Sequence, residues 1–396
     1  MNQRDFIHSS LMKFSFFILT VYFFLYSTTI TNSLLQSKLV LVIGLAMAVA
    51  AFVIKKKIDL NRNFFLYLLV TIMASTELFY VLFKDKHIND FDNLFLYSLI
   101  IIIALNGLNI NSYIKISFYT KCVLTLIIII LFSFHAIQET TLARENTIRH
   151  SLGFFHPNSL GFIAMVLTIE YLLLYLKKSN WMVLTFITLL NGLIYQLTLS
   201  RSSFICSLIV LFAAFLYKYT KVLERDWFHI FMLTFIPIMF LLSAFMPLTY
   251  NSSKHFYGLI NQLFSGRLEM GYYYLERVGT SLFGRPFPET LHIEYPNINV
   301  LLDSAFLRLL IQSGWLIFII VLVGILYRCY QLIRENHLFD VCVILTLLIF
   351  SFFERTTNNI FLCASILVLF VKTDQKQYLL YKMKQKLVML KKNKVK

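Results

Sequence analysis

Charged residues, glycine and proline are all scarce in this sequence of 396 residues. Charged side chains make up 14% of it, and there are only 12 glycines and 6 prolines. Ordinary soluble domains carry about a quarter charged residues. Apolar residues (58%) exceed what a soluble core of this size needs, which excludes a soluble globular protein. No Gly/Ser-rich or Pro-rich linker interrupts the chain, so residues 1–396 are predicted to form one integral domain.

The cysteines exclude two further classes. All five lie within or at the edges of apolar runs, at positions 122, 206, 329, 342 and 363, and none lies in a long polar stretch. They form no Cys-x-x-Cys pair and no cluster with histidine. A disulfide framework and a structural zinc site are therefore not expected.

Apolar runs dominate what is present. A transmembrane helix needs roughly 20 apolar residues, and the mean hydropathy of the chain is +0.72. The sequence predicts an all-α, polytopic integral membrane protein with about twelve transmembrane helices. The runs are residues 14–30, 38–54, 64–83, 94–110, 116–137, 159–176, 181–199, 202–217, 230–248, 305–327, 338–353 and 357–371.

The distribution of the net charge of +16 along the chain indicates a membrane protein rather than a protein that binds nucleic acid. If the N-terminus is cytoplasmic, threading the twelve runs places most lysines inside, which is the positive-inside pattern. Both termini are then cytoplasmic. The tail, residues 372–396, alternates basic and apolar residues and is expected to lie on the anionic inner leaflet.

The arginines are distributed differently from the lysines in this topology. Guanidinium binds phosphate oxygens with two parallel hydrogen bonds and stays charged when partly desolvated. An arginine cluster on the outer side therefore predicts an anionic ligand there, although each arginine taken singly could snorkel or pair with an acid. Eight of the thirteen arginines fall outside: Arg144, Arg149, Arg201, Arg267, Arg277, Arg285, Arg308 and Arg355.

Arg201 is the most conspicuous of these arginines. It stands in "LTLSRSSFICSLIVL" (197–211), where two apolar runs meet without a loop. Insertion scales assign arginine a cost of roughly 2.5–3.5 kcal/mol at the middle of a membrane helix. Binding of an anion at the outer ends of the two helices would offset this cost. The alternative is that Arg201 caps helix carbonyls.

Residues 249–304 form the largest segment between apolar runs and are predicted to be a large extracytoplasmic loop. Within it, "HFYGLINQLF" (255–264) and "GRLEMGYYYLERVGTSLFG" (266–284) have helical apolar spacing, which predicts interfacial or re-entrant helices. The second places Arg267 and Tyr274 near one face. Tyrosine forms interfacial belts and also stacks on sugar rings.

Four stretches resemble the Wzy-type polymerases of capsule and O-antigen synthesis, within the superfamily that includes the O-antigen ligases. They are "GFFHPNSLGFIAMVL" (153–167), "LSRSSFICSLIVL" (199–211), "SGRLEMGYYYLERVGTSLFGRPF" (265–287) and "LDSAFLRLLIQSGWLIF" (302–318). Their order and predicted topology match that family over about residues 150–370. In the ligase branch a histidine stands eleven positions before the glycine that corresponds to Gly314. In this chain Asp303 occupies that position, which favours the polymerase branch.

The resemblance implies a bacterial cytoplasmic membrane enzyme, a glycosyltransferase that polymerises polyprenyl-diphosphate-linked oligosaccharide repeat units at the outer face. A flippase and a chain-length regulator would be its protein partners. Arg201 and Arg267 would hold the diphosphate in place of a metal, so no metal or cofactor is expected, and Asp303 would act as the base unless it is a helix cap. The remaining predicted substrate-binding residues are Arg308, His156, Asn158, Tyr274 and Arg277.

Two other functions remain open from the sequence. A flippase for lipid-linked oligosaccharides would also have many helices and intramembrane charges, such as Glu77. A metal-dependent glycosyltransferase would use the Asp-x-Asp of "NDFDN" (89–93), a motif short enough to arise by chance. His156 opens a helix with proline and asparagine behind it, so a capping role competes with sugar binding.

Overall fold

The computed structural model describes residues 3–30, 38–54, 98, 101–105, 108–144, 147–251, 254–285, 287–288, 290–293 and 298–370. Two antiparallel hairpins pair β1 (Leu142–Arg144) with β2 (Thr147–Arg149) and β3 (Thr290–Ile293) with β4 (Ile298–Leu301). The helices are α1 (Gln3–Tyr26), α2 (Lys38–Ile54), α5 (Ile110–Ser133), α6 (Pro157–Tyr175), α7 (Trp181–Thr198), α8 (Arg201–Tyr219), α9 (Asp226–Leu248), α10 (His255–Leu263), α11 (Arg267–Arg277), α12 (Ala305–Arg334) and α13 (Leu338–Phe353), with short 3₁₀ segments η1 (Val222–Glu224), η2 (Thr356–Asn358) and η3 (Ala364–Leu369).

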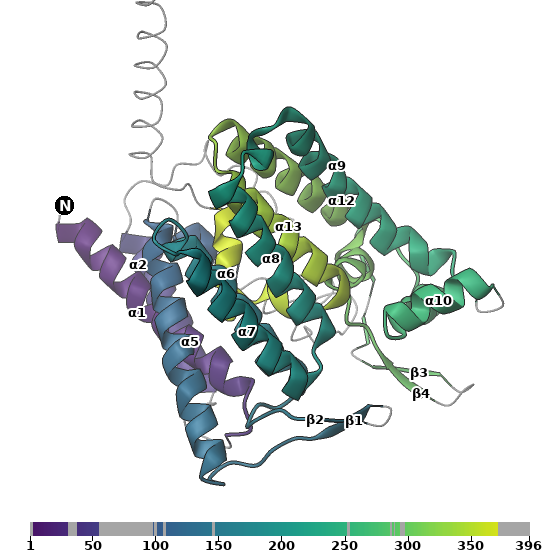
Figure 1. The fold of residues 1–396 in the computed structure, drawn as a ribbon, viewed down its shortest axis with the longest axis horizontal. Coiled ribbons are helices and arrows are strands. Elements are labelled where there is room, and N and C mark those ends of the chain that lie inside the picture. Colours follow the sequence, from purple (N-terminus) through teal and green to yellow (C-terminus); the bar gives the residue numbers. More distant parts are fainter. Residues whose placement is uncertain are drawn as a thin grey trace, which may run out of the picture.

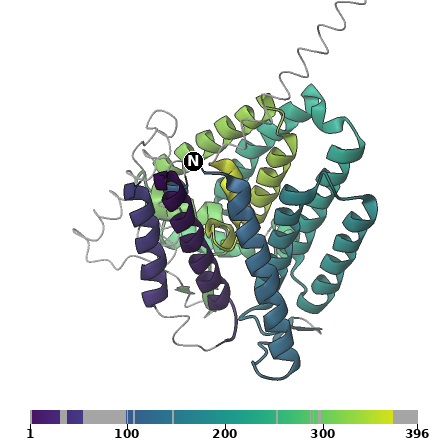
Figure 2. The same cartoon turned by 90° about the vertical axis from the view of Figure 1, so that its left-hand side faces the viewer.

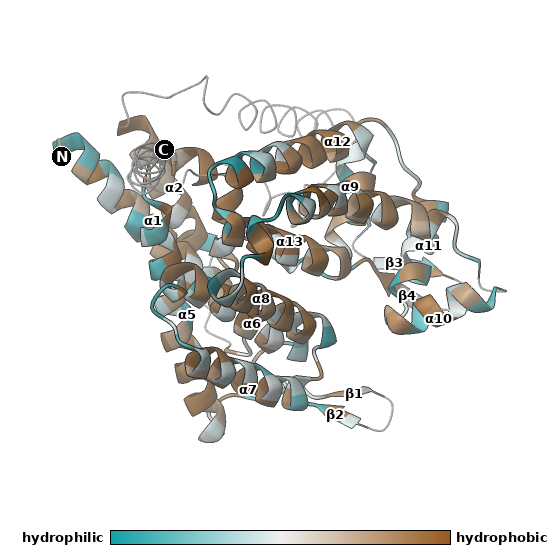
Figure 3. Cartoon of the chain, turned by 45° about the horizontal axis from the view of Figure 1, so that its top comes forward, coloured by the Kyte–Doolittle hydropathy of each residue, from teal (hydrophilic) through white to brown (hydrophobic). Residues whose placement is uncertain are grey.

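Seven of these helices are long and apolar enough to cross a membrane: α1, α5, α6, α7, α8, α9 and α12. The shorter α2 and α13 are also apolar. Figure 3 shows apolar residues along the lengths of the helices and polar residues mainly at their ends. The chain is therefore a predominantly helical membrane protein. The predicted run 64–83 and about half of the run 94–110 lie outside the described residues, as do the tail from residue 371, Glu77 and "NDFDN".

Helices α6, α7, α8 and α9 run in alternating directions through the bundle, and α12 and α13 also run in opposite directions. We call the end that carries both hairpins the hairpin end; α6, α8 and α12 begin there (Figure 1). Figure 2 shows α1 and α2 side by side next to α5. Lys177, Lys178, Lys218 and Lys221 lie at the opposite end, in or next to the turns that join α6 to α7 and α8 to α9.

Helix α13 lies at the centre of the bundle. It packs against α8, α9 and α12. Twelve of its 16 residues are buried, and they contribute to both hydrophobic clusters of the described residues. At 1.5 Å per residue it is only about 24 Å long, shorter than the roughly 30 Å of a bilayer core. Glu354 follows its last residue, Phe353, directly and is buried.

The predicted helix over residues 357–371 is wrong, because the described part of this run contains a 3₁₀ segment and turns in place of an α-helix. Side chains satisfy its backbone groups instead. Lys121 Nζ donates to the Leu362 carbonyl at 2.7 Å, and the Ala364 amide donates to Glu170 Oε1 at 3.2 Å. Lys121 and Glu170 form a fully buried ion pair at 2.7 Å. Irregular backbone is tolerated at membrane depth when protein groups satisfy it in this way.

A break in α12 receives the turn that follows α11. Gly314 has φ 82° and ψ 173°, so the helix is interrupted there. The amide of Trp315 donates to Ser281 O, and the amide of Arg285 donates to Ile311 O. A β-carbon on Gly314 would lie 2.3 Å from the Gly284 amide nitrogen, so the two backbones approach only because both residues are glycine.

The segment 249–304 is folded in its described part. Both predicted helices form, as α10 and α11, although α11 ends at Arg277 rather than continuing to residue 284. The β3–β4 hairpin occupies the later part of the segment, where no strand was predicted. Gly271 lies within 3.1 Å, measured from its ideal β-carbon position, of side-chain atoms of Pro247 and Leu307, so α11 packs closely between α9 and α12.

Candidate functional site

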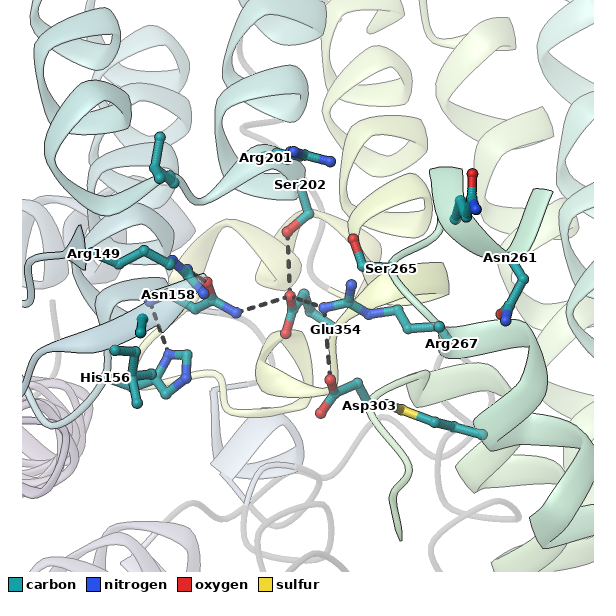
Figure 4. A pocket seen from close by; sticks show the side chains of 16 residues that line it. Arg149, His156, Asn158, Arg201, Ser202, Asn261, Ser265, Arg267, Asp303 and Glu354 are labelled. Atoms are coloured by element: carbon teal, nitrogen blue, oxygen red, sulfur yellow. Dashed lines mark hydrogen bonds and ion pairs between the residues drawn. The ribbon is translucent and has the colours of Figure 1, made fainter. Parts of the chain in front are cut away.

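A cavity of about 910 Å³ lies at the hairpin end, where segments distant in the sequence converge (Figure 4). The starts of α6, α8 and α11 line it, together with α10, the residue before Ser304 and the residue after α13. Such a volume suits a ligand larger than a single small ion. Its polar lining residues are Arg149, His156, Asn158, Arg201, Ser202, Asn261, Gln262, Ser265, Arg267, Asp303 and Glu354.

Glu354 is the centre of the polar network. Its Oε1 accepts from Arg267 Nη2 at 2.6 Å, from Ser202 Oγ at 3.2 Å and from Asn158 Nδ2 at 3.4 Å. Asn158 in turn accepts from Arg149 Nη2. One carboxylate thus ties α6, α8 and α11 to the end of α13, as the dashed lines of Figure 4 show.

Asp303 shares the same guanidinium. Its Oδ2 lies 3.6 Å from Arg267 Nη2, and its side chain is 37% exposed, whereas that of Glu354 is 10% exposed. The N-cap of α12 is Ser304, whose hydroxyl accepts from the Leu307 amide. The alternative interpretation of Asp303 as the helix cap is therefore wrong. Its carboxylate faces the cavity beside Arg267.

Arg201 lines the same cavity and is exposed. Among the described residues no hydrogen bond, ion pair or ring contact joins its guanidinium to another side chain. Ser200, the residue before it, makes no side-chain cap at the start of α8, so the first amides of that helix keep their partial positive charge without a side-chain acceptor. An unpaired cation at an uncapped helix start favours a negatively charged ligand.

His156 combines the two roles that the sequence left open. Its Nδ1 accepts from the Asn158 amide at 3.0 Å and so caps α6. Its ring also lines the cavity. Burial and the charge of Arg149 lower the pKa of His156, against a smaller opposing effect of Asp303. The neutral ring then carries its proton on Nε2, which makes it a hydrogen-bond donor rather than a base.

The burial of Glu354 raises its pKa to about 7, and the neighbouring charge of Asp303 adds to the shift. Arg267, Ser202 and Arg149 act in the opposite direction. Two carboxylates that share one guanidinium cannot both ionise as readily as isolated ones. The site therefore holds a proton that is exchangeable near neutral pH.

Three predicted substrate-binding residues lie outside the cavity. Arg308 is fully buried, with its guanidinium carbon 4.6 Å from the centroid of the Phe287 ring and its Nε donating to Gln312. Tyr274 is also fully buried and stacks on Phe287 from 5.0 Å. Arg277 is exposed at the far end of α11. Arg277 lies ten residues beyond Arg267, about 15 Å along α11 at 1.5 Å per residue, and no residue of α12 lines the cavity.

Glu354, Arg149 and Ser202 belong to the cavity but were not predicted as site residues. Glu354 precedes Arg355 directly in the sequence, but its carboxylate pairs with Arg267. The available signal was its position as the single acid between residues 341 and 370. In the described part of the chain no three His, Cys, Asp or Glu side chains lie close enough together to hold a metal ion.

No protein family model matches the chain, and no curated protein or solved structure matches it either.

Proposed function

We propose that the chain is a glycosyltransferase of the outer membrane face that polymerises polyprenyl-diphosphate-linked oligosaccharide repeat units into a surface polysaccharide, as the resemblance to Wzy-type polymerases implies. The observation that carries the proposal is the meeting of Arg201, Arg267 and Asp303 around one large cavity at the end of a membrane bundle. These residues come from three separate stretches of the resemblance, about 100 residues of sequence apart at the widest.

The arginines support an anionic leaving group. In this reaction the anomeric carbon of one lipid-linked glycan loses its bond to the diphosphate, which departs with the electron pair. Preorganised cations that face the developing charge stabilise the transition state. Arg201 is unpaired within the described chain, and the starts of α8 and α11 add helix-dipole charge of the same sign. A lipid tail can remain in the bilayer while its headgroup occupies a cavity at this level.

The carboxylates support proton transfer from the acceptor. A sugar hydroxyl of the second glycan forms the new bond to the anomeric carbon and must lose its proton. Asp303 is the more exposed carboxylate, and its one ion pair among the described residues is with Arg267, so it is the proposed base. Glu354 accepts three hydrogen bonds and is the proposed organiser of the Arg267 guanidinium. His156 Nε2 and Asn158 are left to contact sugar hydroxyls.

The lysines support the outward orientation. Lys177, Lys178, Lys218 and Lys221 lie at the end opposite the cavity, in or beside the α6–α7 and α8–α9 connections, whereas Lys254 lies at the hairpin end. Cytoplasmic loops are enriched in Lys and Arg, which supports a cytoplasmic location for that end and an outer location for the hairpin end in the proposed bacterial cytoplasmic membrane. A reporter fused within 249–304 should therefore report an extracytoplasmic location.

The test is elongation by the purified chain in proteoliposomes that contain lipid-linked repeat units. Longer lipid-linked glycans should accumulate, with EDTA present throughout, and Arg201→Lys should slow their formation. Repeat units that cross the bilayer without growing would assign the chain to transport instead. Activity that appears only after Mn²⁺ or Mg²⁺ is added would favour a metal-dependent enzyme acting through "NDFDN".

A further inference from the structure

We propose that α10 lies in the membrane–water interface with one apolar face seated on the lipids of the leaflet at the hairpin end. The face consists of Phe256, Leu259 and Leu263. Bilayer lipid, rather than another part of this chain or a second protein, is its partner. The inference depends on the membrane-spanning bundle and does not rest on the proposed function.

The face is apolar and open. Phe256 is 66% exposed, Leu259 is 53% exposed and Leu263 is 74% exposed. Their spacing of three and four residues places them within about 60° around a helix that turns 100° per residue. No residue of α10 is buried. Three large apolar side chains in a row are typical of a surface that water does not cover.

Hydrogen bonds fix the orientation of this face. Asn261 lies on the opposite side of α10 from Leu259 and Leu263. Its Nδ2 donates to Glu269 Oε2 at 3.0 Å, and its Oδ1 accepts from the Glu269 amide at 3.1 Å. These bonds hold the polar side of α10 against α11. The apolar face therefore cannot turn inward without losing both.

Packing places α10 at the depth of the membrane boundary. Phe264, at its end, lies 5.7 and 5.1 Å from the ring centroids of Phe352 and Phe353, the last two residues of the membrane helix α13. Helix α9 is about 35 Å long at 1.5 Å per residue, enough to span the bilayer core. Its exposed apolar surface continues to Leu248, close to its end. Figure 1 shows α10 just beyond that end, at the margin of the molecule.

The rim of the face has interfacial chemistry. Lys254 and His255 are exposed at the start of α10. Tyr250 and Tyr257 contact each other at its side, with ring centroids 6.0 Å apart. Cations beside an apolar face complement lipid phosphates, and tyrosine is enriched at membrane interfaces. A lipid headgroup thus fits the charge of this rim as well as its position.

Spin labels can test the proposal in bilayers of phosphatidylethanolamine and phosphatidylglycerol. A nitroxide is attached to three variants of the full chain, each with one added cysteine: Leu263→Cys on the apolar face, Gln262→Cys on the cavity side and Leu241→Cys on α9 as the lipid-facing reference. The unsubstituted chain sets the background, since four of its five cysteines are buried. Collision rates with oxygen report lipid, and those with a nickel chelate report water.

The ratio of oxygen to chelate collisions at position 263 should match that at position 241 and exceed that at position 262. A ratio at 263 equal to that at 262 would mean that water covers the face, and the proposal would be overturned. Dipolar broadening between labels at 263 would reveal a second copy on the face and would overturn it as well. Elongation activity enters none of these readouts.

Discussion

Two ion pairs of nearly equal length have different surroundings in this protein. Lys121 and Glu170 meet at 2.7 Å with both side chains fully buried. Arg267 and Glu354 meet at 2.6 Å, with 19% and 10% of their side chains exposed beside the cavity. The inner pair is surrounded by Ser117 and the backbone of 362–364. The outer pair faces space that a ligand can enter.

The distance between the two charges therefore does not distinguish a structural ion pair from a functional one. The distinguishing property is whether a ligand can reach the pair. The inner pair satisfies backbone groups that a helix would otherwise satisfy, so we interpret it as architectural. The outer pair leaves Asp303 and Arg201 beside it with unused capacity, so we interpret it as part of a site. Each of the following substitutions tests one side of this contrast.

The largest effect is expected at Asp303. Asp303→Asn keeps the size of the side chain but cannot accept a proton, and loss of a general base lowers rates by about 10²- to 10⁴-fold. The measurement is the initial rate of glycan elongation in proteoliposomes. Ser304→Ala is the matched control, since it removes the actual cap and costs about 0.5–2 kcal/mol of stability. Near-normal elongation by Asp303→Asn would exclude the base.

Breaking the inner pair should affect folding. Lys121→Met leaves Glu170 buried without its partner, and such single removals cost about 3–5 kcal/mol. The double variant Lys121→Met/Glu170→Leu should recover much of that loss, because no lone charge stays buried. Thermal unfolding in detergent measures both. If the double variant also lost elongation activity while it unfolded normally, the architectural interpretation of the pair would fail.

The arginine substitutions are expected to have a smaller effect. Arg201→Lys and Arg267→Lys keep the charge but lose the planar fork. A lost charged hydrogen bond is worth about 1.5–3 kcal/mol, or about 10- to 150-fold in rate. Arg277→Lys, on the same helix as Arg267 but outside the cavity, should retain the normal rate. Equal rates for all three variants would argue against phosphate binding by guanidinium.

The smallest effect is a dependence of stability on pH. Because the pKa of Glu354 is raised in the folded chain to about 7 from 4.5, the folded state binds this proton more tightly than the unfolded state. Binding of this proton adds to the free energy of unfolding. The added stability is complete below pH 4.5 and is lost as the pH rises to 7, by at most about 1.4 kcal/mol per pH unit. Glu354→Gln should lack this decline. Parallel unfolding curves for both proteins across this range would contradict the shift.

Much of the fold follows from local sequence. Hydropathy predicted the helices from α6 to α9 and α12 close to their observed positions, because a span needs a continuous apolar stretch and little else. Helical spacing likewise predicted α10 and α11. Of the candidate site, Arg201, Arg267, Asp303, His156 and Asn158 were predicted, and the structure brings all five to one cavity. These residues lie near helix ends on the same side of the membrane, and in a compact bundle such ends lie close to one another.

The sequence by itself thus determined that the chain enters a membrane and which polar residues lie near helix ends at one side. Only the tertiary structure decided which of them meet. Glu354 became the centre of the network because the short helix α13 ends beside Ser202 and Arg267. Residues 357–370 do not form the predicted α-helix, and Lys121, more than 200 positions away, donates to a backbone carbonyl in this segment. Hydropathy is a property of neighbours in sequence, whereas these contacts join residues that only folding brings together.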